Sequence, residues 1–117
     1  MTSPTRTSVG VHIIMNVYDV PENLLTSLDI GMPLCDSIVQ SLPLTVLQRT
    51  GHQFQPHGYT ILYLLSESHF SIHTYPEHRS CYLDIFCCNR TFDPAAAVAT
   101  VCETFHTQKG EYQVLTR

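Results

Sequence analysis

An apolar run in the middle of the chain passes directly into a polar segment, and this feature constrains the fold more than any other. Residues 61–65 (Ile-Leu-Tyr-Leu-Leu) are typical of a buried strand. Where that strand would continue, residues 66–77 are mostly polar: Ser-Glu-Ser-His-Phe-Ser-Ile-His-Thr-Tyr-Pro-Glu. Each polar group buried without a partner costs roughly 1–3 kcal/mol. We therefore expect this segment to lie beside the core and to use its polar side chains in a site.

The composition indicates a single globular domain, 1–117. A chain of 117 residues is long enough to bury roughly two thirds of its unfolded surface. Hydrophobic residues make up 44% of it, which is typical of a globular protein. A net charge of −4 and the lack of a lysine or arginine run argue against nucleic acid or an anionic membrane as partner. With neither a bilayer-spanning apolar stretch nor a signal-peptide pattern, we expect a cytoplasmic protein. The 5 cysteines show no disulfide-scaffold spacing and are expected to be free thiols.

Runs rich in apolar and β-branched residues predict the strands. These strands cover 11–18, 44–47 with a bend near Gly51, 59–65, 70–75, 80–88 and an edge strand at 112–115. The polar segment 1–9 has no periodicity and is expected to be disordered.

Capping residues and prolines mark the expected helices. Asp19 is a plausible N-cap for a short first helix, which Gly31 and Pro33 should interrupt. A second helix is expected over 33–42, with Pro43 ending it, and a final helix over 94–106.

Strands in one block with a few helices predict an α+β fold, a two-layer sandwich in which helices cover one face of an antiparallel sheet. The other sheet face would still need a cover. The simplest cover is a second copy of the same sheet, so we expect a symmetric homodimer in which the two sheets pack together.

Segment 66–77 closely resembles the self-processing segment of the prokaryotic S-adenosylmethionine decarboxylases, which make their pyruvoyl cofactor from an internal serine. The resemblance runs from about His12 to the last helix. Its other sharp parts are Pro56-x-Gly58-x-Thr60 and Asp84-Ile-Phe-Cys-Cys88. It implies cleavage of a proenzyme between Glu67 and Ser68, with Ser68 becoming the pyruvoyl group.

The resemblance also implies roles for other residues. His73 matches the processing histidine of the family, and Cys88, rather than Cys87, matches its catalytic cysteine. Phe54 falls near an aromatic residue that packs on the adenine of the substrate, and Glu77 falls on an acidic residue at the substrate site. The family further implies a homodimer with active sites at or near the subunit interface.

The residues themselves suit this chemistry. The Ser68 hydroxyl can attack the carbonyl of Glu67 to form an ester; β-elimination then cleaves the chain, and hydrolysis of the dehydroalanine leaves a pyruvoyl group. The reaction needs a strained or polarised peptide bond, an oxyanion stabiliser and a base. His73 suits the base role, Thr60 can donate a hydrogen bond to the carbonyl, and Cys88 can later protonate the substrate carbon. The finished group would accept the electrons released as carbon dioxide leaves a small-molecule substrate.

The chain departs from the family at three places, and two of them, Tyr75 and Asn89, leave the substrate open. Thr60 stands where serine is usual, Tyr75 stands where tryptophan is usual, and Cys87-Cys88-Asn89 replaces Thr-Cys-Gly. Aromatic faces at Phe54 and Tyr75 suit an adenosyl sulfonium. An acidic cluster without aromatic residues would instead favour ornithine or arginine.

The leading hypothesis is a pyruvoyl-dependent carboxy-lyase that acts on S-adenosylmethionine for polyamine (spermidine) biosynthesis. One alternative is an ornithine or arginine decarboxylase on the same scaffold. Another is an unprocessed, non-catalytic partner of an active homologue, although the joint presence of Ser68, His73 and Cys88 argues against it.

Structural roles compete with some of these assignments. Phe54 can be a core residue, and Glu77 can be a solvated turn residue. His69 and His73 share a strand face and, with Cys87 and Cys88, have the ligand types of a zinc site. Because no Cys-x2-Cys pair is present, we predict no metal ligand.

Overall fold

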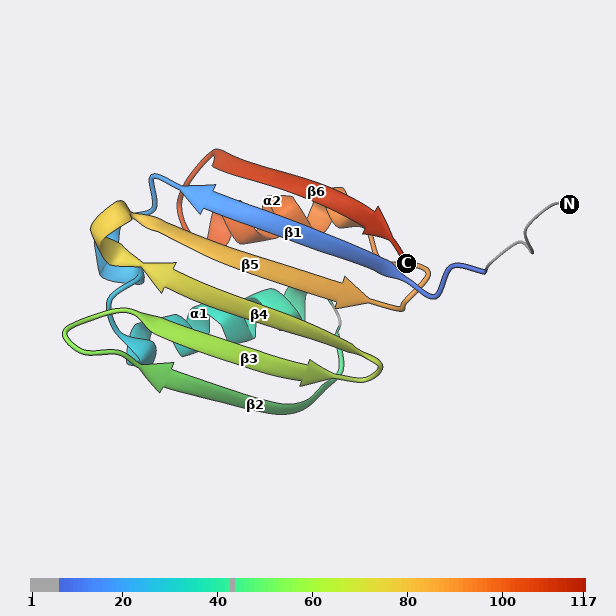
Figure 1. Cartoon of the computed structure of the whole chain (residues 1–117), viewed down its shortest axis with the longest axis horizontal. Helices are drawn as coiled ribbons and strands as arrows, with labels where there is room; N and C mark the ends of the chain where they lie inside the picture. Colours follow the sequence, from blue (N-terminus) through green and yellow to red (C-terminus); the bar gives the residue numbers. More distant parts are fainter. Residues whose placement is uncertain (1–6, 43) are drawn as a thin grey trace, which may run out of the picture.

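Six strands form one antiparallel sheet in the order β2-β3-β4-β5-β1-β6 (Figure 1). The computed structural model describes residues 7–42 and 44–117. The strands are β1 (Val11–Tyr18), β2 (Val46–Gln53), β3 (Tyr59–Leu65), β4 (Ser68–Tyr75), β5 (Ser80–Cys87) and β6 (Lys109–Thr116). The helices are α1 (Leu28–Ser41) and α2 (Pro94–Thr104), with short 3₁₀ helices η1 (Glu22–Leu24) and η2 (Pro76–His78).

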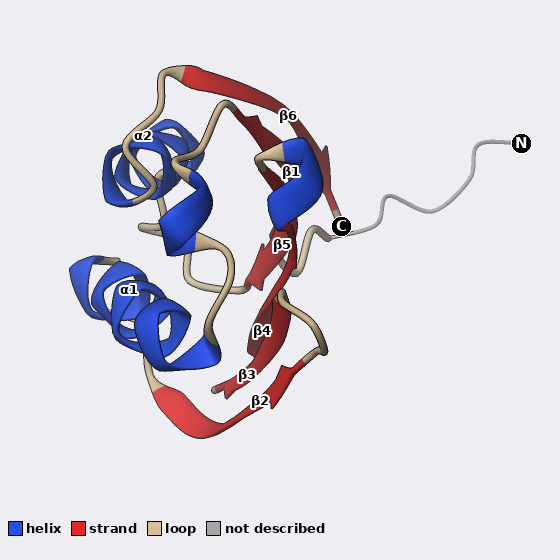
Figure 2. Ribbon diagram, turned by 90° about the vertical axis from the view of Figure 1, so that its left-hand side faces the viewer, coloured by secondary structure: helices blue, strands red, loops and turns tan. Residues whose placement is uncertain are grey.

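Both α-helices lie on the same face of the sheet (Figure 2). The core lies between these two layers, because alternate strand residues point toward the helices. Tyr63 of β3 and Phe70 of β4 stack there, with ring centroids 5.4 Å apart. The predicted α+β two-layer fold is therefore confirmed.

Helix α1 is one continuous helix, so the prediction that Gly31 and Pro33 interrupt it is wrong. Gly31 is needed for close packing, because a Cβ there would lie 2.1 Å from the Tyr59 ring. Burial of this helix face against the sheet outweighs the hydrogen bond lost at Pro33. Ser27, whose hydroxyl accepts from the Asp29 amide, caps the helix. Pro43, expected to end a helix, lies outside the described residues.

Asp19 does not cap a helix as predicted. Its backbone has a φ of 55° and its carboxylate pairs with Lys109 at 2.8 Å, so only the short η1 follows it. The strand boundaries also differ from the prediction. Strand β2 begins at Val46 and passes through Gly51, which pairs with Ile61, while its register shifts between Val46 and Gln48.

The ends of the chain show further differences. Strand β6 begins at Lys109, well before the predicted edge strand, and pairs with β1 along its length. The segment expected to be disordered is described only from residue 7 onward. There, the Arg117 carbonyl accepts hydrogen bonds from the Ser8 hydroxyl and the Val9 amide. The part of the chain that the structure describes contains no helix long and apolar enough to cross a membrane.

We call the sheet face opposite α1 and α2 the open face (Figure 2). Apolar side chains lie on it as well as polar ones; Leu62 and Leu64 of β3 are 46% and 52% exposed. Strand β4 contributes the alternating polar residues of segment 66–77 to this face and its edge. Strand β5 contributes those of the Asp84–Cys88 motif.

Candidate active site

The Glu67–Ser68 peptide bond lies in the tight turn between β3 and β4, where Leu65 pairs with Ser68. Glu67 has a φ of 60°, in the left-handed region. A residue with a Cβ in this conformation is destabilised by roughly 1–2 kcal/mol. The chain therefore holds backbone strain directly before the serine that was predicted to attack.

Cys88 lies next to this turn. Its thiol donates a hydrogen bond to the Glu67 carbonyl oxygen, with Sγ and O 2.9 Å apart. The Ser68 hydroxyl donates to the Ser66 carbonyl at 3.1 Å. These residues line a pocket of about 180 Å³ at the end of the sheet. We call Glu67, Ser68 and Cys88 the cleavage group.

Cys87 has a different environment from Cys88. Its side chain is 1% exposed in the core, because it is the last residue of β5 that points toward the helices. All five cysteines fall within the described residues and none is in a disulfide, as predicted. The position of Cys88 beyond the strand end is what brings its thiol to the Glu67 carbonyl.

A second pocket, of about 330 Å³, lies where β3 begins and β4 ends, and it contains the other predicted site residues. We call these residues the pocket group: Phe54, Thr60, His73, Tyr75 and Glu77. Thr60 and His73 are paired across β3 and β4, and Thr60 Oγ1 lies 2.9 Å from His73 Nδ1.

The rest of the pocket group supplies aromatic faces and a negative charge. Phe54 is 46% exposed and Tyr75 is 43% exposed, so neither is a core residue. A hydrogen bond from its own backbone amide, with a further one from His57, lowers the pKa of Glu77 and keeps it ionised. Sequence reasoning missed His57, whose Nε2 lies 3.4 Å from Glu77 Oε2, because nothing in its local sequence distinguishes it from a loop histidine.

The two groups are at opposite ends of the sheet. Ser68 is the first residue of β4 and His73 lies five residues further along it. At about 3.3 Å per residue, their backbones are about 17 Å apart. Within one chain, therefore, His73 cannot reach Ser68. Thr60, expected to donate to the Glu67 carbonyl, contacts His73 instead, and within the chain it is Cys88 that donates to that carbonyl.

Comparison with known proteins gives consistent results. The family model described as "S-adenosylmethionine decarboxylase" matches residues 11–117. An Archaeoglobus fulgidus protein named "S-adenosylmethionine decarboxylase proenzyme" is 37% identical over 109 residues, covering 93% of this chain and 97% of that protein. A protein of the same name from Hydrogenobaculum sp. is 39% identical over 90 residues, covering 77% of this chain and 65% of the relative.

Solved structures agree with these sequence matches. The crystal structure of the adenosylmethionine decarboxylase from Aquifex aeolicus has a TM-score of 0.85 and 30% identity, covering 96% of this chain and 92% of that one. The Trypanosoma brucei AdoMetDC-delta26 monomer is only 16% identical, with a TM-score of 0.69 over 89% of this chain, and supports the fold alone. The family predicted from segment 66–77 is therefore confirmed: the chain belongs to the S-adenosylmethionine decarboxylase family, whose members are carboxy-lyases.

Proposed function

We propose that this chain is a proenzyme that cleaves itself between Glu67 and Ser68 and then decarboxylates S-adenosylmethionine. The observation that carries the proposal is the 2.9 Å hydrogen bond from the Cys88 thiol to the Glu67 carbonyl. It polarises a peptide bond that follows a strained residue, Glu67, and precedes a nucleophilic hydroxyl, that of Ser68.

The cleavage proceeds in balanced steps. Ser68 Oγ bonds to the Glu67 carbonyl carbon, the C–N bond breaks, and the amide becomes an ester. A base removes the α-proton of Ser68, the Glu67 carboxylate leaves, and a dehydroalanine remains on the second fragment. Water then hydrolyses its imine tautomer and releases ammonia. The net change is one water consumed and one ammonia released, and the N-terminus of fragment 68–117 becomes a pyruvoyl group.

Replacing Cys88 with alanine should slow self-cleavage about 100-fold, the lower end of the effect of removing one oxyanion donor. Band densities of full-length and cleaved chain over time would give the rate. Cys87→Ala is the matched control, since that thiol lines the same pocket but is buried, while the hydrogen bond to the Glu67 carbonyl comes from Cys88. This variant should cleave at a rate close to that of the unmodified chain. Equal slowing in both variants would assign the effect to packing.

The active site that we propose is shared between two chains. In a two-fold dimer that packs the open faces together, antiparallel strands place the cleavage group of one chain beside the pocket group of its partner. Exposed apolar residues on the open face, including Leu62 and Leu64, support this packing. The separation of about 17 Å between Ser68 and His73 supports it independently.

Each group then has a distinct role. His73, held by Thr60 at Nδ1, acts as the base of the cleavage reaction. Phe54 and Tyr75 present aromatic faces to the adenine and the sulfonium, and the Glu77 carboxylate adds a favourable negative charge. The pyruvoyl group, once formed, supplies the electron sink for loss of carbon dioxide. Cys88 gives a proton to the carbon that carbon dioxide leaves.

The substrate is tested by carbon dioxide release from fully cleaved protein. We expect release from S-adenosylmethionine, with ornithine and arginine at least about 100-fold slower, because the pocket offers two aromatic faces and a single carboxylate. Release from ornithine or arginine alone would support the alternative enzyme. No release from any of the three would reject the decarboxylase activity.

The product would donate aminopropyl groups for polyamine (spermidine) biosynthesis. The free cysteines also support a reducing compartment, in keeping with a cytoplasmic location.

A further inference from the structure

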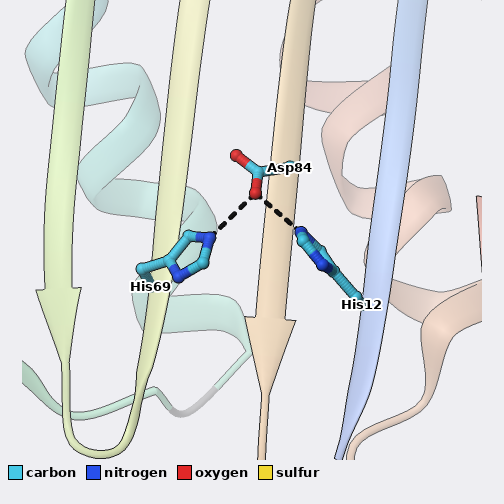
Figure 3. A group of neighbouring side chains, drawn as sticks. All are labelled: His12, His69 and Asp84. Atoms are coloured by element: carbon cyan, nitrogen blue, oxygen red, sulfur yellow. Dashed lines mark hydrogen bonds and ion pairs between the residues drawn. The ribbon is translucent and has the colours of Figure 1, made fainter. Parts of the chain in front are cut away.

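Three side chains outside both groups converge on the open face: His12 of β1, His69 of β4 and Asp84 of β5 (Figure 3). Asp84 Oδ2 lies 2.7 Å from His12 Nε2 and 2.8 Å from His69 Nε2. One nitrogen from each imidazole and one carboxylate oxygen thus lie within 4.8 Å of one another. Of the three, only His69 was considered as a metal ligand from the sequence, with other partners, and no metal ligand was predicted.

The three side chains are held in place by their neighbours. His12 and His69 both pair with Phe86, from opposite sides of β5, and their rings lie 5.6 Å and 6.0 Å from its ring. Ser71 donates a hydrogen bond to Asp84 Oδ1, the oxygen that faces away from the imidazoles. Such second partners fix the orientation of ligating side chains in metal sites.

We propose that His12, His69 and Asp84 bind one divalent metal ion of the Zn²⁺ class. A set of two imidazole nitrogens and a carboxylate oxygen favours Zn²⁺ over Mg²⁺ and Ca²⁺, which prefer oxygen ligands. With bonds of about 2.0 Å at tetrahedral angles, the ligand atoms would be about 3.3 Å apart. The observed N–O separations of 2.7 Å and 2.8 Å need to open by only about half an ångström.

Within a single chain the site is partly exposed, and in the dimer proposed above it would lie between the two packed sheets. His69 has 45% of its side chain exposed, and Asp84 has 26%. In the single chain, a water molecule can therefore supply a fourth ligand. The ion would join β1, β4 and β5 across the open face, and its ligand His69 directly follows Ser68 in the chain.

Arg117 opposes metal binding. Its Nη1 donates to His12 Nδ1 at 3.1 Å, and since a guanidinium can only donate, the proton of neutral His12 must be on Nε2. Binding through Nε2 moves that proton to Nδ1, so the Arg117 side chain has to withdraw. Removing this guanidinium should therefore strengthen binding.

The test is a titration of the full-length chain with Zn²⁺, measured by calorimetry, and with Co²⁺, measured by its visible spectrum. We expect one ion per chain with nitrogen and oxygen ligands. His69→Gln and Asp84→Asn should each weaken the affinity at least about 10-fold, and Arg117→Gln should raise it several-fold. Since His69 is nearly half exposed, the fold of His69→Gln should be intact, which its circular dichroism would verify.

Two matched controls separate this site from other ligands. His106→Gln removes an exposed histidine after α2, and Cys88→Ser removes a partly exposed thiol; neither should change the affinity. No binding by the unmodified chain, equal binding by His69→Gln, or loss of binding in Cys88→Ser would each overturn the proposal. Because the readout is metal binding, this result is independent of whether the chain cleaves itself or decarboxylates a substrate.

Discussion

Replacing Ser68 with alanine is expected to leave the chain at full length and to abolish decarboxylation. The variant keeps the strained Glu67 and the Cys88 hydrogen bond to its carbonyl, but it has no hydroxyl to form the ester. No pyruvoyl group can then arise, so activity should fall below detection. Intact mass over long incubation would measure cleavage, and carbon dioxide release would measure activity.

Ser66→Ala is the matched control for this variant. Ser66 lies in the same turn, but only its backbone carbonyl contacts Ser68. We expect it to cleave at a rate close to that of the unmodified chain. Cleavage of Ser68→Ala at the same bond would contradict the proposed nucleophile, and failure of both variants would point to damage to the turn.

Mixing two inactive chains is expected to restore cleavage. Neither variant should cleave alone. Ser68→Ala has no nucleophile, and His73→Ala has lost the general base, which costs about 10²–10⁴ in rate. In a mixed dimer, the intact Ser68 of one chain meets the intact His73 of its partner. With equal expression and random two-fold pairing, about half of the His73→Ala chains should be cleaved. Intact mass of the co-expressed chains would measure this fraction.

A second mixture controls for nonspecific rescue. Ser68 and Cys88 lie in the same cleavage group, so co-expressing Ser68→Ala with Cys88→Ala should give cleavage no faster than Cys88→Ala alone. If the Ser68→Ala and His73→Ala pair remained uncleaved in a verified mixed dimer, the shared active site would be wrong. Cleavage of the second mixture faster than that of Cys88→Ala alone would also contradict the grouping of residues proposed here.

Local sequence patterns predicted much of the fold. Strand alternation identified β1, β3 and β5, and the apolar spacing identified a helix before β2. Gly31 was wrongly predicted to interrupt a helix, because a tertiary contact determines the residue there. Only the position of the Tyr59 ring, 28 residues later, shows why a glycine is needed within a continuous helix.

The candidate site was predicted in part, for a similar reason. Segment 66–77 identified Ser68 and His73, and the family resemblance added Cys88 and Phe54. That Ser68 and His73 lie at opposite ends of β4 follows from strand geometry only once both are known to be in one unbroken strand. The contact of His12 with Asp84 joins residues 72 positions apart, and no local pattern marks it.

The most direct test of the central claim is the intact mass of the purified, unmodified chain under denaturing conditions. We expect two fragments, 1–67 and 68–117, with the second lighter than a serine-started fragment by the mass of one ammonia. That mass would establish both the cleavage point and the pyruvoyl group derived from Ser68. A single full-length mass that persists through long incubation, or a second fragment that still begins with serine, would contradict the proposed self-processing.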